Sequence, residues 1–493
     1  MANNFKSDDS FLRKLAVGAA GTNATIKRLV AMHYKPIELE RGSRGFKIWK
    51  KIKIKRVRVP DILCLASGLR FESRGKTKVE ISMSHSLKDP KRAWDAGMRD
   101  DDYVSIVILH QTEESPTEPE EISPVHFILV RDLKAAFAAK QIAISQPKGV
   151  EEGSEIRVVW TCASANLTSI VELVEPTRIR LRPQDGSRVQ TIQLSRARGQ
   201  IQLLPQVAEN SLVEANQIVA AVVPVTTSLP APKTVSESFF VERLKSVNLS
   251  ERYAAAKALR YLGFGAKTKK LLETRVNDQD EDIYVQLEAA AALAAFDYNC
   301  GWEFIQSRLN SDNLGVALET QLETVIVASE IPSTKSETLL IAVLTDHSRD
   351  EELRAGAAWA LGQFHSSNSA AALVSTFNSS PMEIRTEAAR ALLSISEKQI
   401  PYLIDRLKSD DPANRDGIAW VLARCKRFDP QELVVKNDDE NLRQWTSYVI
   451  GHGRDRFEEA ELKSICESDP QVYFAASVLW QIVQSWINEI TEY

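Results

Sequence analysis

Two carboxylates early in the chain have the types and the spacing to hold a divalent cation. The run VRVPDILCLA is typical of a strand, ASGL of a tight turn, and LRFESRGK of the strand that returns. Such a hairpin would place Asp61 and Glu72 on adjacent strands, although ten residues separate them in the sequence. Hard carboxylate oxygens suit Mg²⁺ or Mn²⁺, so we expect these two acids to share a metal ion.

Two basic residues, Arg74 and Lys76, follow Glu72 at alternate positions of the same expected strand. A bound Mg²⁺ or Mn²⁺ would generate hydroxide from water near neutral pH and stabilise charge on phosphoryl oxygens. A cation beside the metal would hold that water and offset the charge that develops during the reaction. Arg74 and Lys76 are therefore the candidate catalytic residues for phosphodiester hydrolysis.

Pro60-Asp61 followed by Glu72-Ser73-Arg74 resembles the motif of the PD-(D/E)XK nuclease superfamily, which ends in Glu-x-Lys. The resemblance implies an α/β core with a mixed sheet, metal ligation by Asp61 and Glu72, and cleavage of nucleic acid. This sequence departs from the family motif at Arg74, which stands where the family has lysine. The difference matters because an arginine does not readily give up its proton. Either Lys76 takes the role of the family's lysine, or Arg74 only stabilises charge, or the site is degenerate.

The same superfamily often carries a further acid on an early helix. Glu38 and Glu40 follow the helix-like segment NATIKRLVAMHYK, and Glu40 is the candidate third metal ligand. A purely structural interpretation is also open. Proline commonly starts a strand, aspartate commonly caps a turn, and a glutamate that faces an arginine is often a simple cross-strand pair.

A strongly basic segment precedes and includes these acids. Residues 44–78 carry twelve Lys or Arg and two acids, a local excess of +10. Between residues 51 and 58 the charges alternate with apolar residues, which would gather most of them on one face of a strand. Lysines can simply protect an edge strand, but clustered like charges repel one another, and bound phosphates would relieve that repulsion. We therefore expect contact with nucleic acid, and with DNA in particular, from Lys47, Lys50, Lys51, Lys53, Lys55, Arg56 and Arg58.

The elements that must position these residues suggest three kinds of domain. Residues 1–145 continue with a helix near PKRAWDAGM, strands at DYVSIVIL and VHFILV, and a helix at RDLKAAFAAKQ, which fits an α/β domain. Residues 150–226 contain six short segments rich in β-branched residues and predict a small β-barrel or sandwich. Residues 227–235, with their prolines and hydroxyl residues, are typical of a linker.

Residues 236–493 repeat an Ala-rich helix that ends in an apolar anchor, as in RYAAAKALRYLG, RAGAAWALGQF and RTEAARALLSI. Consecutive anchors are 28 to 34 residues apart, a period typical of an α-solenoid built from helix pairs. One pair cannot bury its apolar face alone, so the pairs must stack. The predicted anchors are Leu259, Leu293, Val327, Leu361, Leu392, Leu422, Ile450 and Leu479.

The repeats resemble HEAT repeats, in which an arginine early in the second helix meets acidic or carbonyl groups of a neighbouring unit. Five copies carry an arginine at the matching position, seven residues before the anchor, and the expected role of these residues is structural: Arg252, Arg354, Arg385, Arg415 and Arg443. The resemblance implies a surface that binds a protein partner and says almost nothing about which partner.

The bulk composition bounds the function further. The five cysteines are scattered, which fits reduced thiols, and the N-terminus has no apolar run after its basic residues, so we expect a cytoplasmic protein. No apolar stretch is long enough to cross a bilayer, so we expect no membrane partner. The net charge of −4 includes a tail, residues 431–493, with an excess of −7. A polyanion would therefore meet the front of the chain.

Two functions compete. The first is a Mg²⁺- or Mn²⁺-dependent DNA endonuclease whose solenoid holds the target or a protein partner, a combination suited to DNA processing or defence. The second is a non-catalytic scaffold in which a degenerate nuclease domain binds nucleic acid or protein. A third interpretation rests on the repeats alone, because short HEAT-like repeats also occur in bilin lyases, but it gives the basic front domain no role.

Overall fold

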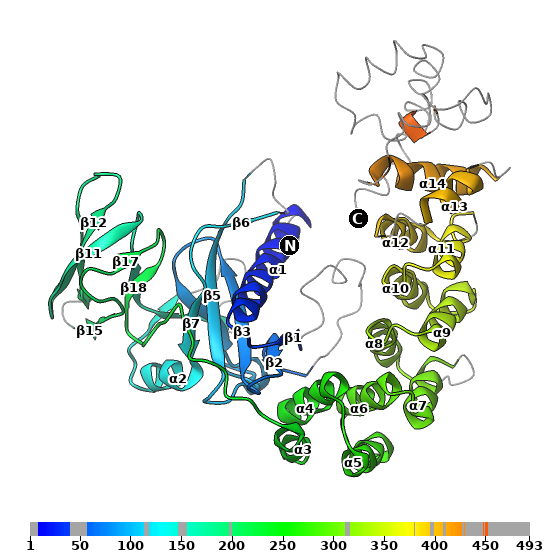
Figure 1. The fold of residues 1–493 in the computed structure, drawn as a ribbon, viewed down its shortest axis with the longest axis horizontal. Helices are drawn as coiled ribbons and strands as arrows, with labels where there is room; N and C mark the ends of the chain where they lie inside the picture. Colours follow the sequence, from blue (N-terminus) through cyan, green and yellow to red (C-terminus); the bar gives the residue numbers. More distant parts are fainter. Residues whose placement is uncertain are drawn as a thin grey trace. The chain divides into compact units, whose positions relative to one another are not determined.

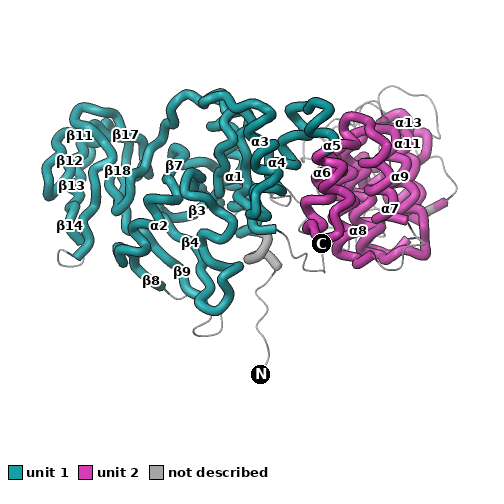
Figure 2. The backbone as a smooth tube through the Cα atoms, turned by 90° about the horizontal axis from the view of Figure 1, so that it is seen from below, with its two compact units in different colours: residues 1–44, 56–270 teal, residues 45–55, 271–493 magenta. Residues whose placement is uncertain are grey.

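The computed structural model describes residues 8–39, 57–112, 118–145, 155–196, 200–310, 316–378, 380–394, 399–407 and 411–425, with isolated positions up to residue 451. The described residues fall into two compact units (Figure 2). Along the chain, the boundary between the units falls within one helix, between Lys270 and Leu271. The first unit holds every described strand and the first helices. The second holds the stacked helix pairs. In the described part of the chain, no helix is both long and apolar enough to cross a membrane.

A six-stranded mixed sheet forms the centre of the first unit. Its path runs β1-β2-β3-β5-β6, and β7 pairs with β5. Strand β2 is antiparallel to β1 and to β3, β3 is parallel to β5, and β7 is antiparallel to β5. The bounds are β1 Pro36–Glu38, β2 Ile62–Cys64, β3 Arg70–Lys76, β5 Tyr103–His110, β6 Glu120–Glu121 and β7 His126–Leu129. The predicted hairpin and both predicted later strands are therefore present.

Helices cover both faces of this sheet. Helix α1 (Asp8–Ala31) lies along β3 and β5, and its Val17 and Ala24 share an apolar cluster with Phe71 (Figure 1). Helix α2 (Val130–Ala138) follows β7 and buries Leu133 in the other main cluster of the unit, together with Ile106 of β5. The expected α/β layering around a mixed sheet is thus what the chain adopts.

The predicted helix near residues 90–98 is wrong: the chain forms only a single 3-10 turn, η1 (Pro90–Arg92). Two features stop it from continuing. Ala93 is extended, which directs Trp94 into the core, where its ring lies 4.9 Å from that of Trp160. Gly97 has a φ of 78°, a left-handed conformation that an α-helix cannot include.

The β-rich part does not stand apart from the α/β part. Strand β9 (Glu155–Trp160) pairs with β4 (Ile81–Ser86) and β8 (Ala143–Ser145) in a three-stranded sheet. Further sheets run β10-β18-β16, β13-β12-β11-β17 and β14-β15. Their strands are β10 Cys162–Ser164, β11 Ser169–Val174, β12 Arg178–Pro183, β13 Gln190–Gln193, β14 Ser195–Arg196, β15 Ile201–Gln202, β16 Leu204–Pro205, β17 Leu212–Val213 and β18 Ile218–Ala221.

Among the described strands no sheet closes on itself, so the predicted barrel is wrong and the sandwich alternative is closer. The three- and four-stranded sheets turn apolar side chains, such as Val219 and Leu181, into one cluster. That cluster also contains Ile106 and Val158, so it extends into the α/β part. His126 reinforces the junction, because its Nε2 accepts a hydrogen bond from the Ile218 amide at 2.8 Å and burial lowers its pKa to about 4.

The segment 227–235, predicted as a linker, contains no helix or strand but is held on the first unit. Leu229 is buried in the cluster beneath α1, and the Tyr34 hydroxyl donates to the Pro230 carbonyl at 2.6 Å. The Val235 amide donates to the Ala66 carbonyl at 2.9 Å. These contacts tie the start of the helical region to the sheet.

Helices follow in pairs from residue 237 to the end of the described chain. In the second unit the Ala-rich helices and their partners form two stacked rows (Figure 1). The predicted anchors within the described residues are all buried, from Leu259 through Ile450. The helices are α3 Glu237–Leu244, α4 Leu249–Leu262, α5 Ala266–Asn277, α6 Ile283–Ala295, α7 Asn299–Leu309, α8 Leu318–Ser329, α9 Thr334–Thr345, α10 Glu351–Leu361, α11 Ser367–Val374, α12 Met382–Leu393, α13 Ile400–Arg406 and α14 Pro412–Arg424.

One of the recurring arginines, Arg354 of α10, shows the structural role that the sequence pattern predicted. It is 3 % exposed, and its Nε donates to the Leu344 carbonyl of α9 at 2.9 Å. Its Nη2 donates to Ser380 just before α12 at 3.1 Å, so this side chain joins α9, α10 and the turn before α12. Arg443 lies outside the described residues.

Close helix approach in the solenoid gives the first prediction. At Gly301 of α7 an added Cβ would lie 2.5 Å from the Ala290 carbonyl oxygen and 2.6 Å from the Ala294 amide nitrogen of α6. Gly301→Ala should therefore force the helices apart and lower the free energy of unfolding by about 1–3 kcal/mol, measured by urea denaturation. Gly265→Ala is the matched control, since nothing lies within 4 Å of its added Cβ. Equal stability of the two variants would contradict the packing described.

Candidate active site

Asp61 directly precedes β2, and Glu72 lies within β3, the strand that pairs with β2. The antiparallel register of β2 and β3 pairs Ile62 with Phe71 and Leu63 with Arg70, so both acids lie one position beyond the Ile62–Phe71 pair. The Ser73 amide donates to Asp61 Oδ2 at 2.6 Å, which fixes the Asp61 carboxylate against β3. Each acid is 8 % exposed. The hairpin expected from the sequence thus places the two acids at the same end of the paired residues of β2 and β3.

Alternation along β3 places the other candidate residues on the same face as Glu72. Phe71, Ser73 and Gly75 point to α1, since Phe71 packs with Val17 and a Cβ at Gly75 would meet the Val17 carbonyl. Side chains alternate along a strand, so the even-numbered residues Arg70, Glu72, Arg74 and Lys76 occupy the opposite face. The two acids and the two predicted catalytic cations therefore share one face of the sheet.

A buried hydroxyl network supports this strand on the side of α1, and no sequence pattern predicted it. Thr25 Oγ1 of α1 lies 3.2 Å from Ser73 Oγ and 3.0 Å from Ser105 Oγ of β5. Ser105 Oγ also donates to the Glu72 carbonyl at 3.4 Å. Three elements are thereby linked beneath the acids. Hydroxyl residues far apart in sequence do not predict such a contact, because it depends on how α1 lies on the sheet.

Arg74 pairs with Glu72 through an ion pair between Nη2 and Oε1. The Arg74 side chain is 40 % exposed, while that of Glu72 is 10 % exposed, so the guanidinium is the member of the pair that solvent reaches more easily. A guanidinium in this position can neutralise charge on a neighbouring group but cannot serve as a base.

Lys76 is held in a drier environment on the same face. Its Nζ donates to both the carbonyl and the hydroxyl of Ser82 at 2.8 Å and lies 3.6 Å from Glu80 Oε1. Burial, as the largest influence, lowers the Lys76 pKa to about 8, against the opposing effect of Glu80. A partly desolvated lysine that titrates near neutral pH is the kind of group that active sites contain.

The desolvation of Lys76 predicts a specific pH dependence of stability. Its folded pKa of about 8 lies below the ordinary 10.5, so between these pH values the unfolded chain binds more protons than the folded chain does. The free energy of unfolding therefore increases as the pH rises. Lys76→Met removes this dependence. The stability of the variant relative to wild type, measured by urea denaturation, should fall by about 2 kcal/mol as the pH rises from about 7 to 9.5. The exposed Lys78→Met is the control and should show no such trend.

The other predicted site residues are placed as follows. Glu38 ends β1, where it pairs with Ile62, and Arg58 is exposed just before the hairpin. Glu40 and the remaining predicted nucleic-acid contacts, Lys47, Lys50, Lys51, Lys53, Lys55 and Arg56, lie outside the described residues. Within the described ranges, no group of three His, Cys, Asp or Glu side chains is arranged to hold a metal ion. Asp61 and Glu72 are thus a carboxylate pair whose oxygens fit a hard cation.

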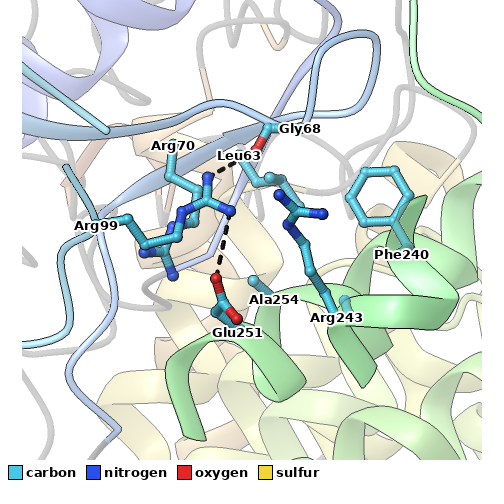
Figure 3. A pocket seen from close by; sticks show the side chains of 9 residues that line it. Leu63, Gly68, Arg70, Arg99, Phe240, Arg243, Glu251 and Ala254 are labelled. Atoms are coloured by element: carbon cyan, nitrogen blue, oxygen red, sulfur yellow. Dashed lines mark hydrogen bonds and ion pairs between the residues drawn. The ribbon is translucent and has the colours of Figure 1, made fainter. Parts of the chain in front are cut away.

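A cluster of arginines adjoins this face where β2 turns into β3. Arg70 is 1 % exposed and donates from Nε and Nη2 to the two carboxylate oxygens of Asp102, at 3.0 Å and 2.5 Å. Its Nη1 donates to Ser250 of α4 at 3.1 Å. Arg99 lies 3.1 Å from Asp102. It also forms an ion pair with Glu251 of α4 at 3.6 Å, which Figure 3 shows. The cluster joins α4 to the sheet and fixes the end of the strand that carries Glu72.

The fully buried Asp102 should therefore be essential for stability. Asp102→Ala would leave the Arg70 charge uncompensated inside the protein, which should lower the free energy of unfolding by about 3–5 kcal/mol. Asp101→Ala is the matched control, because the Asp101 side chain contacts the same Arg99, at 3.1 Å, but is 58 % exposed. Its effect should stay within about 0.5 kcal/mol. A small effect of Asp102→Ala in urea denaturation would mean that the ion pair does not hold this junction.

Comparison with known proteins identifies the helical region only. The sequence profile of HEAT repeats matches residues 319–394 and 337–423, so the C-terminal half contains HEAT repeats. A comparison with curated protein sequences found no match.

Three solved structures illustrate the similarity to other proteins. The X-ray structure of YibA from E. coli has 15 % identity, covers 50 % of this chain and 93 % of its own, and has a TM-score of 0.26. Human deoxyhypusine hydroxylase in complex with glycerol has 17 % identity, coverages of 47 % and 87 %, and a TM-score of 0.19. The CpcE–CpcF complex of phycocyanin lyase from Nostoc has 17 % identity, coverages of 54 % and 97 %, and a TM-score of 0.20. Scores this low carry no argument about activity.

Proposed function

We propose that this protein is a metal-dependent nuclease that hydrolyses phosphodiester bonds in DNA. The observation that carries the proposal is the position of Asp61 and Glu72 at the same end of the paired residues of β2 and β3, with Arg74 and Lys76 on the same face of β3 as Glu72. A carboxylate pair beside two cations is suited to binding a phosphate through a divalent cation and to neutralising the charge that cleavage creates. The HEAT repeats would hold the target or a protein partner.

Each residue has a defined part in this reaction. Asp61 and Glu72 would hold Mg²⁺ or Mn²⁺, with Glu40 as a third ligand, and the metal would supply activation of water and of the phosphate. Arg74, which is the more exposed of the two cations, would contact a phosphoryl oxygen. Lys76, with a pKa of about 8, would orient the attacking water or exchange a proton with it. The Ser73 amide keeps the Asp61 carboxylate turned to β3.

The surrounding fold supports the same proposal. The two acids lie on a hairpin within a mixed sheet that has helices on both faces, which is the arrangement implied by the resemblance to the PD-(D/E)XK superfamily. Arg74 at the lysine position is the departure from that pattern. Lys76 lies one alternation further along the same face, so it is the residue that would compensate. The described cysteines are free thiols, in keeping with a cytoplasmic location.

One observation favours a second candidate, a non-catalytic scaffold that binds nucleic acid or protein. Glu72 is ion-paired with Arg74 and nearly buried, so its carboxylate is already neutralised without a metal. In a degenerate site this pair would be purely structural. The two candidates differ in one respect that can be measured: a nuclease must exchange the Arg74 contact for a metal ion, and a scaffold need not.

The nuclease proposal is tested by incubating supercoiled plasmid and single-stranded DNA with the full-length protein in Mg²⁺, Mn²⁺ or EDTA. Metal-dependent cleavage is expected for the wild type, and Asp61→Asn and Glu72→Gln should each lower the rate at least about 100-fold, since each removes a charged metal ligand. Asp100→Asn is the matched control because its side chain is 72 % exposed, and it should cleave like the wild type.

Two outcomes would reject the nuclease. Cleavage that survives in both acid variants would come from another site or from a contaminant. Absence of cleavage by the wild type in both metals, together with salt-sensitive DNA binding, would establish the scaffold instead.

A further inference from the structure

The outer face of the four-stranded sheet β13-β12-β11-β17 carries a row of arginines that the sequence motifs did not single out. Strand β12 alternates strictly. Ile179 and Leu181 are fully buried in the core, while the arginines on either side of them point outward. The outward side chains are 45 %, 41 % and 66 % exposed for Arg178, Arg180 and Arg182. Both features follow from the two-residue period of a strand, which makes one face apolar and the other cationic.

The arginines of this face outnumber the acids that pair with them. Glu172 of β11 pairs with both Arg180 and Arg182, and Glu175 pairs with Arg178 at 2.8 Å. Three arginines against two glutamates leave an excess of +1. Ion pairs at an exposed surface contribute only about 0–1 kcal/mol. A polyanion can therefore replace the glutamates at little cost.

The row presents its charges at regular intervals. Alternate residues of a strand are about 6.6 Å apart, so the three arginines form a line of evenly spaced cations. Such a line is electrostatically complementary to the evenly charged backbone of a nucleic acid. The planar guanidinium also suits the oxygens of a phosphate better than the ammonium of a lysine does.

The same face has an apolar flank and no aromatic residue. Ile170 pairs with Arg182 on one side and with Leu212 on the other, and Ile170 and Leu212 are 44 % and 57 % exposed. Strands β11, β12, β13 and β17 contain no Phe, Tyr or Trp, so they offer no ring on which an unpaired base could stack. Contact with the backbone of a duplex, with the aliphatic side chains against its sugars, fits this surface better than capture of single strands.

We propose that this outer face binds the phosphate backbone of duplex DNA without regard to sequence, through Arg178, Arg180 and Arg182. The inference rests on the proposed nuclease function only for the identity of the polyanion. Val171 and Leu181 beneath the arginine row belong to the same apolar cluster as Ile106 of β5, which pairs with β3. The arginine row is therefore fixed relative to Glu72 and would hold the duplex while Asp61 and Glu72 act on it.

The test is binding of a fluorescent 30-base-pair duplex by the full-length protein in EDTA, followed by anisotropy over a series of KCl concentrations. The variant R178Q/R180Q/R182Q should bind at least about tenfold more weakly, and its slope of log K against log[KCl] should be shallower by up to about 2.7, or about 0.9 for each lost contact. The variant with three lysines instead, R178K/R180K/R182K, keeps the charge and should retain most of the slope.

A control of equal charge loss separates this face from a general effect of net charge. Lys88, Lys91 and Lys233 are exposed lysines of the same unit, and K88Q/K91Q/K233Q should bind like the wild type. The proposal would be overturned if R178Q/R180Q/R182Q bound the duplex as tightly as the wild type. It would also be overturned if K88Q/K91Q/K233Q lost as much affinity as R178Q/R180Q/R182Q. Circular dichroism and thermal melting of each variant exclude a folding defect.

The outcomes also separate this inference from the nuclease itself. Arginine-dependent binding without metal-dependent cleavage would reject the catalytic proposal and leave this face as a binding surface. A different result would establish the nuclease and overturn the binding face. In that case Asp61→Asn loses cleavage, while the arginine variant keeps both the cleavage rate and the DNA affinity of the wild type. Absence of duplex binding by the wild type would overturn the binding face and would favour a protein as its partner.

Discussion

The buried ion pair between Arg70 and Asp102 holds together the parts of the molecule on which the candidate site depends. Arg70 begins the strand that carries Glu72, Arg74 and Lys76, and Asp102 directly precedes β5, which runs parallel to that strand. Two oppositely charged groups without contact to water are stable only when their remaining hydrogen bonds are also made. Ser250 of α4 and the Gly97 carbonyl complete them. The constraint therefore reaches from the sheet to the first helices that follow it.

The parts of the first unit look different in sequence but form one compact unit. The α/β sheet, the β-rich part and helix α4 share buried clusters or buried polar contacts. Strand β9 pairs with β4, so the β-rich part shares a sheet with the part that carries the candidate site. In a nuclease built in this way, the nucleic-acid contact surface and the metal ligands would belong to the same compact unit. Such an arrangement would favour orientation of a long substrate, since misplacement of reacting groups by about 1 Å can be costly.

The HEAT repeats obey a different constraint. Their helices are rich in alanine, so they approach closely, and glycine at position 301 lets α7 pack directly on the backbone of α6. Buried Arg354 ties α10 to α9. A stack of this kind presents long surfaces.

The sequence alone determined the features that depend on local periodicity. The spacing of alanine-rich helices predicted the repeats and their buried anchors, because each unit repeats the same pattern of burial. The turn between two apolar runs predicted the β2–β3 hairpin. The register of a hairpin is set by its turn, and here it placed Asp61 and Glu72 at the same end of the paired residues. The strands β5 and β7 and the helix α2 followed from equally local patterns.

Only the tertiary structure decided the rest, because it depends on contacts between residues far apart in the chain. The helix predicted near residues 90–98 does not form, because Trp94 packs in the core and Gly97 adopts a left-handed conformation. Strand β9 joined β4 rather than closing a barrel. The support of Ser73 by Thr25 and the desolvation of Lys76 by its surroundings have no local signature. Burial, register across distant strands and the pKa of an enclosed group arise only when the layers are assembled, so local patterns of residue types do not reveal them.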